Sequence, residues 1–262
     1  MPLETLLPQL ALPCLALPWL RAWRPRPTPD LAPLALAAGL VAWGLALRWA
    51  RLGHGPFFNL YEILASSLFS LTLILALFLW RRPDLRAALR TALPVPILLA
   101  IWLVSCEARD SHFHPTYDTG WLWVHLAAGK LFLGFALCAL GVALLAPLRR
   151  RFPRAFPGLA EDGALDRDTW WLLRWALAWE TAMLVAGSAW AQDAWGRYWA
   201  WDPLETWAFL TWLGLVAALH HRQGRRLAPG WTAGMAAGVF LLAFLTFFGV
   251  PFLSLAPHQG AI

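Results

Sequence analysis

The side chains best suited to chemistry in this chain are its histidines and a tryptophan-rich segment. The chain has 7 histidines and 19 tryptophans in 262 residues. Residues 190–207 read WAQDAWGRYWAWDPLETW, which concentrates indoles in one short stretch. Indole faces offer flat apolar surface, and imidazoles are common ligands of iron in porphyrins. Together these residue types predict a site for a large planar ligand that contains a metal.

The tryptophan-rich segment has two interpretations. Its aromatic side chains are Trp195, Tyr198, Trp199 and Trp201. A membrane-interface belt would scatter such rings over several helix ends, whereas one short loop of them forms a flat π-rich platform. Gly196 permits a tight turn, and Arg197 can bind an anionic group on the edge of the ligand. The platform interpretation is favoured.

The second half of this segment predicts the start of a helix. Asp202 can act as the N-cap, Pro203 suits the first helical position, and Glu205 can complete a capping box. We therefore expect these carboxylates to begin a membrane helix and to hold the preceding loop against it. A role for them in acid–base chemistry is not indicated.

Three histidines could serve as metal ligands. His125 lies near the start of an apolar run, and His258 lies in the C-terminal tail. Two imidazoles on opposite faces of a macrocycle can form an axial pair for iron; the alternative for each is a polar residue at the membrane interface. His220 ends an apolar run, where it is either a cation at a helix C-terminus or an intramembrane ligand.

The composition is that of a membrane protein. Hydrophobic residues make up 60% of the chain and charged residues 14%, whereas soluble domains carry about 45–50% and 25%. Stretches of roughly 20 apolar residues can each cross a bilayer as a helix. Seven such runs are apparent: 31–50, 59–80, 88–105, 122–147, 170–190, 206–221 and 231–252. The sequence predicts an all-α, polytopic membrane bundle.

The distribution of arginines predicts the topology and explains the net charge of +6 without nucleic acid as a partner. Four clusters fall on the same side if each run spans once, and positive clusters face the cytoplasm. These are Arg21, Arg24 and Arg26; Arg81, Arg82 and Arg86; Arg149, Arg150, Arg151 and Arg154; and Arg222, Arg225 and Arg226. The 190–207 loop and the C-terminus are then expected outside.

Two parts of the chain are distinguished. Residues 1–30 are apolar and proline-rich, and form either an interfacial helix or an eighth span. Residues 31–262 are expected to form the membrane-embedded domain. The 3 cysteines are isolated, so the chain has no CxxCH motif for covalent haem attachment.

Residues 195–207 closely resemble the tryptophan-rich WWD signature of haem-handling membrane proteins. Among these, the chain most resembles the CcsA (ResC) family of System II cytochrome c biogenesis. Further similarities lie at residues 53–62, 123–125, 219–222 and 248–250. The neighbours of His258, Pro257 and Gln259, differ from the family pattern. The resemblance extends over most of the chain after residue 31.

The resemblance implies haem handling and export, and haem attachment as a subunit of the System II cytochrome c synthase. It places non-covalent haem b, in transit, at an external WWD site between His125 and His258, and gives His220 to an inner haem site. Its binding residues would be Trp195, Arg197, Trp199, Trp201 and Asp202. It also implies an inner (plasma) membrane location with the WWD loop on the periplasmic side.

The partners implied by the resemblance are a separate CcsB-like membrane subunit, an apocytochrome c with a CxxCH motif and a thiol-reducing protein. Two alternatives stay open at this point. A non-enzymatic haem-binding or regulatory protein of the same superfamily would hold haem without attaching it. A permease for another aromatic or amphipathic solute would carry no haem.

Overall fold

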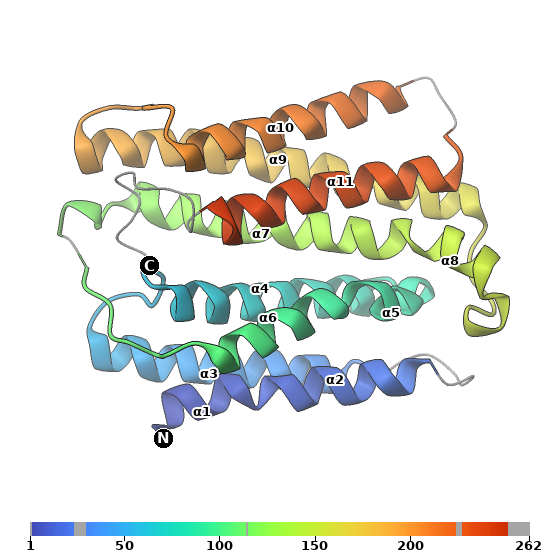
Figure 1. The fold of residues 1–262 in the computed structure, drawn as a ribbon, viewed down its shortest axis with the longest axis horizontal. Coiled ribbons are helices and arrows are strands. Elements are labelled where there is room, and N and C mark those ends of the chain that lie inside the picture. The colour runs from blue at the N-terminus through green and yellow to red at the C-terminus, as the bar shows by residue number, and fades with distance from the viewer. Residues whose placement is uncertain (1, 24–29, 114, 224–226, 251–262) are drawn as a thin grey trace.

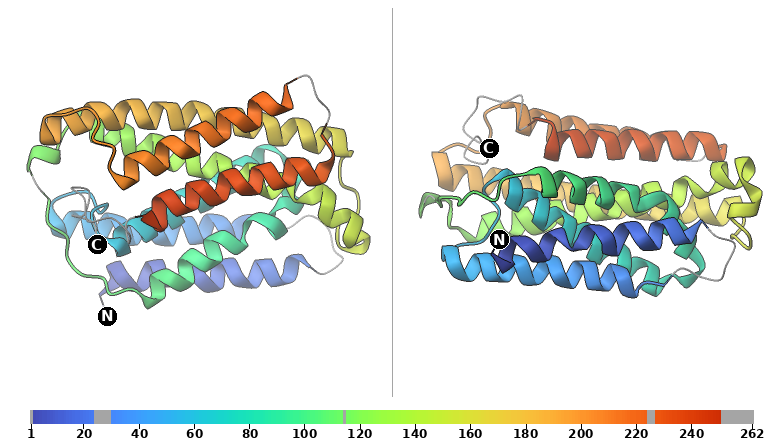
Figure 2. Two further views of the ribbon diagram at one scale, coloured as in Figure 1. Left: turned by 45° about the horizontal axis from the view of Figure 1, so that its top comes forward. Right: turned by 60° about the horizontal axis from the view of Figure 1, so that its bottom comes forward.

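The computed structural model describes residues 2–23, 30–113, 115–223 and 227–250. These residues form a bundle of α-helices whose long axes run side by side (Figures 1 and 2). The helices are α1 (Leu3–Gln9), α2 (Ala11–Ala22), α3 (Ala32–Leu52), α4 (Leu60–Arg81), α5 (Leu89–Ala92), α6 (Pro94–Ser105), α7 (Gly120–Ala143), α8 (Leu145–Arg151), α9 (Asp162–Trp195), α10 (Pro203–Arg222) and α11 (Pro229–Phe248). Short 3₁₀ helices are η1 (Pro83–Ala88), η2 (Pro115–Tyr117) and η3 (Pro153–Ala155).

The predicted all-α, polytopic membrane class is confirmed, but the number of spans differs from seven. Within the described ranges, five helical stretches are long and apolar enough to cross a membrane: Leu3–Ala22, Ala32–Leu52, Leu60–Arg81, Gly120–Arg151 and Pro229–Phe248. A sixth arises if Pro83–Ala92 and Pro94–Ser105, bent by 45°, form one span. Helices α9 and α10 fall short because charged, hydroxyl and indole side chains lower their mean hydropathy.

The N-terminal segment packs as part of the bundle. Helices α1 and α2 both lie against α3, and the side chains of Ala11 and Leu15 on α2 are fully buried. The indole of Trp19 donates to the carbonyl of Arg90, and the Arg90 side chain donates back to the carbonyl of Ala22 at 2.6 Å. The segment is therefore an integral part of the bundle, and its length and apolarity are sufficient for a span.

Helix α7 is the centre of the bundle. It packs against α4, α9 and α11, and its pairing with α9 is the most extensive in the described structure. Small residues permit this closeness: a Cβ on Gly134 would lie 2.4 Å from Ile74 of α4, and one on Gly129 would lie 3.0 Å from Met183 of α9. Helix α7 therefore lies between α9 and α4, so it connects the residues of α9 with the N-terminal half of the chain.

The two ends of the bundle differ in character. One end holds the α3–α4 loop, the α6–α7 connection and the α9–α10 loop with its tryptophans (Figure 1). The opposite end holds the last turns of α4, α8 and α10, with arginines that include Arg81, Arg150 and Arg222. The tryptophan-rich loop and the described arginine clusters therefore lie at opposite ends, as predicted.

Candidate functional site: the tryptophan-rich end of the bundle

The α9–α10 loop begins later than the sequence predicted, because Trp195 is the last residue of α9 and not a loop residue. Gly196 ends the helix with a left-handed φ of 77°, and its N–H donates to the carbonyl of Gln192 at 2.9 Å. Such a glycine C-cap is the usual way to stop a helix abruptly. Trp195 is therefore held on the last turn of a helix, immediately before the loop begins.

The predicted capping box at the start of α10 is confirmed. The carboxylate of Asp202 accepts the N–H of Glu205 at 2.9 Å, and Glu205 accepts the N–H groups of Asp202 at 3.3 Å and Ala200 at 2.7 Å. These bonds fold the end of the loop onto α10. They also hold Trp201 at a φ of 58°, a backbone conformation that non-glycine residues rarely adopt.

Replacing Asp202 with alanine should lower the free energy of unfolding by about 1 kcal/mol, because the N–H of Glu205 loses its acceptor. Thermal unfolding in detergent measures this loss. Asp202→Asn is the matched control, since asparagine retains a capping oxygen and should behave almost as the native protein. If Asp202→Ala is as stable as the native chain, the capping role is wrong.

The loop presents one aromatic cluster formed by Trp199, Trp201, Phe209 and Trp212. The ring centroids of Trp199 and Trp201 are 5.7 Å apart and edge-on, and Trp201 meets Phe209 at 6.0 Å. Trp201 is 64% exposed, whereas the indole nitrogen of Trp199 is buried with no hydrogen-bond partner among the described residues. Arg197, two residues before Trp199 in the chain, is exposed. The cluster combines an accessible ring face with an unused N–H donor.

A second aromatic cluster surrounds His125 of α7. The imidazole stacks on Trp190 of α9 with centroids 6.1 Å apart, and Trp190 meets Trp195 at 4.9 Å. Tyr117 of η2 contacts both indoles, and its carbonyl accepts the Trp190 N–H at 3.2 Å. The structure therefore brings His125 together with the first residues of the tryptophan-rich segment.

The tautomer and position of His125 are set by α9. Its Nδ1 lies 2.9 Å from the carbonyl of Met183, which can only accept, so Nδ1 carries a hydrogen and donates it. The ring fits only because residue 187 is glycine: a Cβ there would lie 2.7 Å from Nδ1. A histidine oriented through Nδ1 by a carbonyl is the usual arrangement of a metal ligand that binds through Nε2.

Of the other two predicted ligands, the described structure places only His220. His220 is exposed in the last turn of α10, at the arginine-rich end, beside His221 and Arg222. This position at the helix C-terminus separates His220 from His125 by the length of the bundle. His258 lies outside the described residues. Of the predicted iron ligands, only His125 is placed at the tryptophan-rich end by the described structure.

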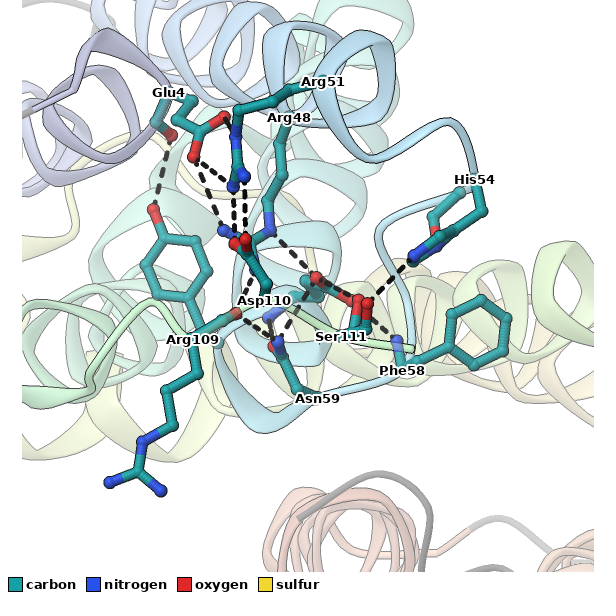
Figure 3. Close-up of polar contacts among 12 residues, drawn as sticks. Glu4, Arg48, Arg51, His54, Phe58, Asn59, Arg109, Asp110 and Ser111 are labelled. Atoms are coloured by element: carbon teal, nitrogen blue, oxygen red, sulfur yellow. Dashed lines mark hydrogen bonds and ion pairs between the residues drawn. The ribbon is translucent and has the colours of Figure 1, made fainter. Parts of the chain in front are cut away.

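A buried polar network at the same end was missed by sequence reasoning (Figure 3). Arg48 of α3 and Glu62 of α4 are both 0% exposed, and the Arg48 Nε donates to Glu62 at 2.9 Å. Glu62 also accepts the hydroxyl of Ser111 at 2.7 Å and the N–H of Phe58 at 2.9 Å. Asn59 caps α4 through the N–H of Glu62. The signal in the sequence that could have indicated this network is that Arg48 and Glu62 are isolated charges within apolar runs.

The network extends to the surface and to the N-terminal helix. Arg51 donates to Glu4 of α1 at 2.7 Å and to Asp110 at 2.6 Å, and its guanidinium holds the pKa of the Asp110 carboxyl below its usual value. The carbonyl of Arg109 accepts from Arg48 and Asn59, while the Arg109 side chain points away (Figure 3). The network thus binds the 106–112 segment and α1 to the α3–α4 pair.

His54 belongs to this network as a structural residue. Its two ring nitrogens lie 3.1 Å from the carbonyl oxygens of Gly55 and Ser111. The ring stacks on Phe113 at 5.6 Å and meets Phe58 edge-on at 5.7 Å. These contacts fix the α3–α4 loop against the 106–113 segment, which leads directly to η2 and Tyr117.

Comparison with known proteins identifies the family. The family model described as cytochrome C assembly protein matches residues 31–258. The cytochrome c biogenesis protein CcsA of Prochlorococcus marinus is 28% identical over 86% of this chain and 82% of its own length. CcsA of Guillardia theta is 29% identical over 82% and 79%, and CcsA of Solanum tuberosum is 29% identical over 82% and 80%.

A solved structure shares the fold. The cytochrome c haem lyase CcmF aligns with a TM-score of 0.61 and 22% identity, covering 94% of this chain and 45% of its own. The chain therefore corresponds to less than half of that larger protein. The resemblance to CcsA proteins seen in the sequence is confirmed by these matches, and the chain belongs to the cytochrome c assembly protein family.

Proposed function

We propose that this chain handles haem during cytochrome c maturation and presents it at the tryptophan-rich end of the bundle. The family match supports a role in cytochrome c assembly. The observation that carries the finer proposal is His125, whose Nδ1–H is bound to the Met183 carbonyl and whose ring stacks among Trp190 and Trp195. A basic Nε2 within an aromatic cluster suits an iron porphyrin.

Two further observations support the fit of this ligand. The buried indole N–H of Trp199 has no partner among the described side chains, so it can donate to a carboxylate on the rim of the macrocycle. Trp201 offers an exposed ring face beside it, and Arg197 supplies positive charge. Aromatic faces and one cation match an apolar disc that carries two anionic groups. We propose Trp195, Arg197, Trp199 and Trp201 as haem-contacting residues, with Asp202 supporting them through the cap.

The protein would contribute to haem attachment by holding the haem in position for the apocytochrome. Each cysteine thiol of an apocytochrome CxxCH motif adds across one vinyl group: sulfur bonds to one carbon and the proton goes to the other. Such an addition needs the reacting atoms held close and the iron held by a ligand that can be replaced. His125 would provide one ligand, and we propose His258 as the second and His220 for an inner site.

Partners and orientation follow from the same proposal. The arginines of the opposite end favour the cytoplasmic side for that end, which places the tryptophan-rich loop outside the cell inner membrane. A CcsB-like membrane subunit would complete the inner site, and a thiol-reducing protein would keep the apocytochrome cysteines reduced. Haem b is the expected cargo, bound without a covalent link.

The proposal is tested by purifying the chain after co-expression with a CcsB-like subunit and a reporter cytochrome, in a host without its own maturation system. We expect non-covalent haem with a bis-histidine absorption spectrum and covalent haem on the reporter. Haem on the complex without attachment to the reporter would instead support a binding or regulatory protein. Absence of haem would contradict the proposal and favour a permease.

Replacing Trp201 with alanine should lower haem occupancy several-fold while the protein stays folded, because an exposed ring face is lost without opening the core. Occupancy is measured by the ratio of Soret to protein absorbance. Trp231→Ala is the matched control, since Trp231 is 67% exposed at the opposite end of the bundle. Equal haem occupancy in the two variants would contradict haem contact by Trp201 and support its interpretation as a membrane-interface residue.

A further inference from the structure

One carboxyl group inside the bundle has no structural explanation. Glu180 of α9 is 0% exposed, and neither of its carboxyl oxygens has a hydrogen-bond partner among the residues that the structure describes. It lies fifteen residues before the end of α9 at Trp195, or roughly 22 Å along the helix axis at 1.5 Å per residue. Glu180 therefore lies deep inside the bundle, far from either end of α9, where an ionisable side chain without a partner is costly.

Glu180 lies on the part of α9 that organises His125. Met183, whose carbonyl holds the imidazole, is three residues further along the helix, about 4.5 Å along the axis. Gly187 and Trp190 continue towards the tryptophan-rich end and contact the same ring. The spacing of Glu180, Met183 and Gly187 places all three on the same face of α9, and α9 packs extensively against α7.

Among the described residues, no charged side chain forms an ion pair with Glu180. Lys130 of α7 is turned to α4, where its ammonium donates to the hydroxyls of Ser66 at 2.9 Å and Ser67 at 2.6 Å. Helix α11 carries no ionisable side chain. The remaining titratable groups on the elements packed against α9 are His125 and Cys138 of α7, Tyr117 of η2, Glu205, His220, His221 and Arg222 of α10, and Arg149, Arg150 and Arg151 of α8; the nearest on α9 itself are Arg174 and Asp193.

An isolated carboxylate in an apolar interior is far costlier than the neutral acid, whereas a positive charge nearby offsets that cost. We infer that Glu180 exchanges a proton in step with the charge of an iron porphyrin bound at His125, an inference that rests on the proposed function. When the bound iron gains one electron from a reductant such as dithionite, Glu180 takes up one proton from water. When the iron is oxidised, Glu180 releases that proton and its carboxylate balances the added positive charge.

The test is a potentiometric titration of the haem-loaded complex over a series of pH values. Linked uptake of one proton per electron should lower the midpoint potential with rising pH by up to about 59 mV per unit, the equivalent of a tenfold change for one electron. Glu180→Gln retains the shape of the side chain but cannot ionise, so it should lose most of this slope. Asp193→Asn, an exposed carboxylate on the same helix, is the matched control and should keep it.

Infrared difference spectra of the native complex provide a second readout. Reduction should produce a carboxylic acid C=O band that is absent from Glu180→Gln. A native slope that persists in Glu180→Gln, or native spectra without a redox-linked carboxylic acid band, would overturn the inference while leaving haem binding intact. A native complex without haem would overturn the proposed function itself and this inference with it.

Discussion

Replacing His125 with glycine is expected to remove most of the haem from the purified complex and to abolish covalent haem on a reporter cytochrome. The expected loss is large because this imidazole, placed by a bond to the Met183 carbonyl and by stacking on Trp190, is the proposed ligand of the iron at this end. Added imidazole should occupy the space left by the ring and restore part of both signals. Absorption spectra and haem staining of the reporter measure them.

A second variant tests the placement of the His125 ring without replacing His125 itself. In Gly187→Ala the new methyl group would lie 2.7 Å from the Nδ1 of His125, so the ring must turn away from the Met183 carbonyl. We expect reduced haem occupancy in a protein with unchanged helix content. Gly163→Ala, on the same helix with open space around the added Cβ, is the control. Full occupancy and activity in both His125→Gly and Gly187→Ala would contradict the assignment of His125.

Replacing Glu62 with alanine is expected to destabilise the protein by about 3–5 kcal/mol, the usual result of removing one member of a buried ion pair. Arg48 would remain 0% exposed with its main carboxylate partner gone, and Ser111, Phe58 and Asn59 would lose a shared acceptor. Unfolding in detergent, followed by tryptophan fluorescence or circular dichroism, measures the loss.

The matched control for that variant is Glu107→Ala. Glu107 and Arg109 form an ion pair at 2.8 Å in the same segment, but both side chains are largely exposed. Exposed pairs contribute at most about 1 kcal/mol, so this change should have little effect on unfolding. Equal stability of Glu62→Ala and Glu107→Ala would show that the network around Arg48 is not needed to hold this end of the bundle together.

Local sequence patterns predicted the features that depend on neighbouring residues. The Asp202–Glu205 capping box needs only two carboxylate acceptors spaced within one helical turn, each taking the backbone N–H of the other residue, and it is confirmed. The placement of the tryptophan-rich loop opposite the arginines needed only the alternation of apolar runs with charge. Trp195 was assigned to the loop wrongly because the stop signal, Gly196, was interpreted as a turn within the loop and not as the C-cap of α9.

Features that depend on distant residues were not predictable in this way. The pairing of Arg48 with Glu62 and Glu4 joins three helices, and the fit of His125 against Gly187 joins two that are separated by 62 positions. Hydropathy patterns treat a single charge in an apolar run as a minor interruption, so they hide Lys130 and Glu180. Such residues can be noticed in a sequence, but their partners are known only once the helices are packed.

The contacts of Glu4 have a practical consequence for defining the shortest stable form of the protein. The family match starts at residue 31, which suggests trimming everything before it. Yet the carboxylate of Glu4 is an acceptor for Arg51 and lies 3.7 Å from Arg48. A chain shortened to the homologous region would retain every residue that the family model matches, but the guanidinium groups of Arg48 and Arg51 would lose a counter-charge supplied from outside that region.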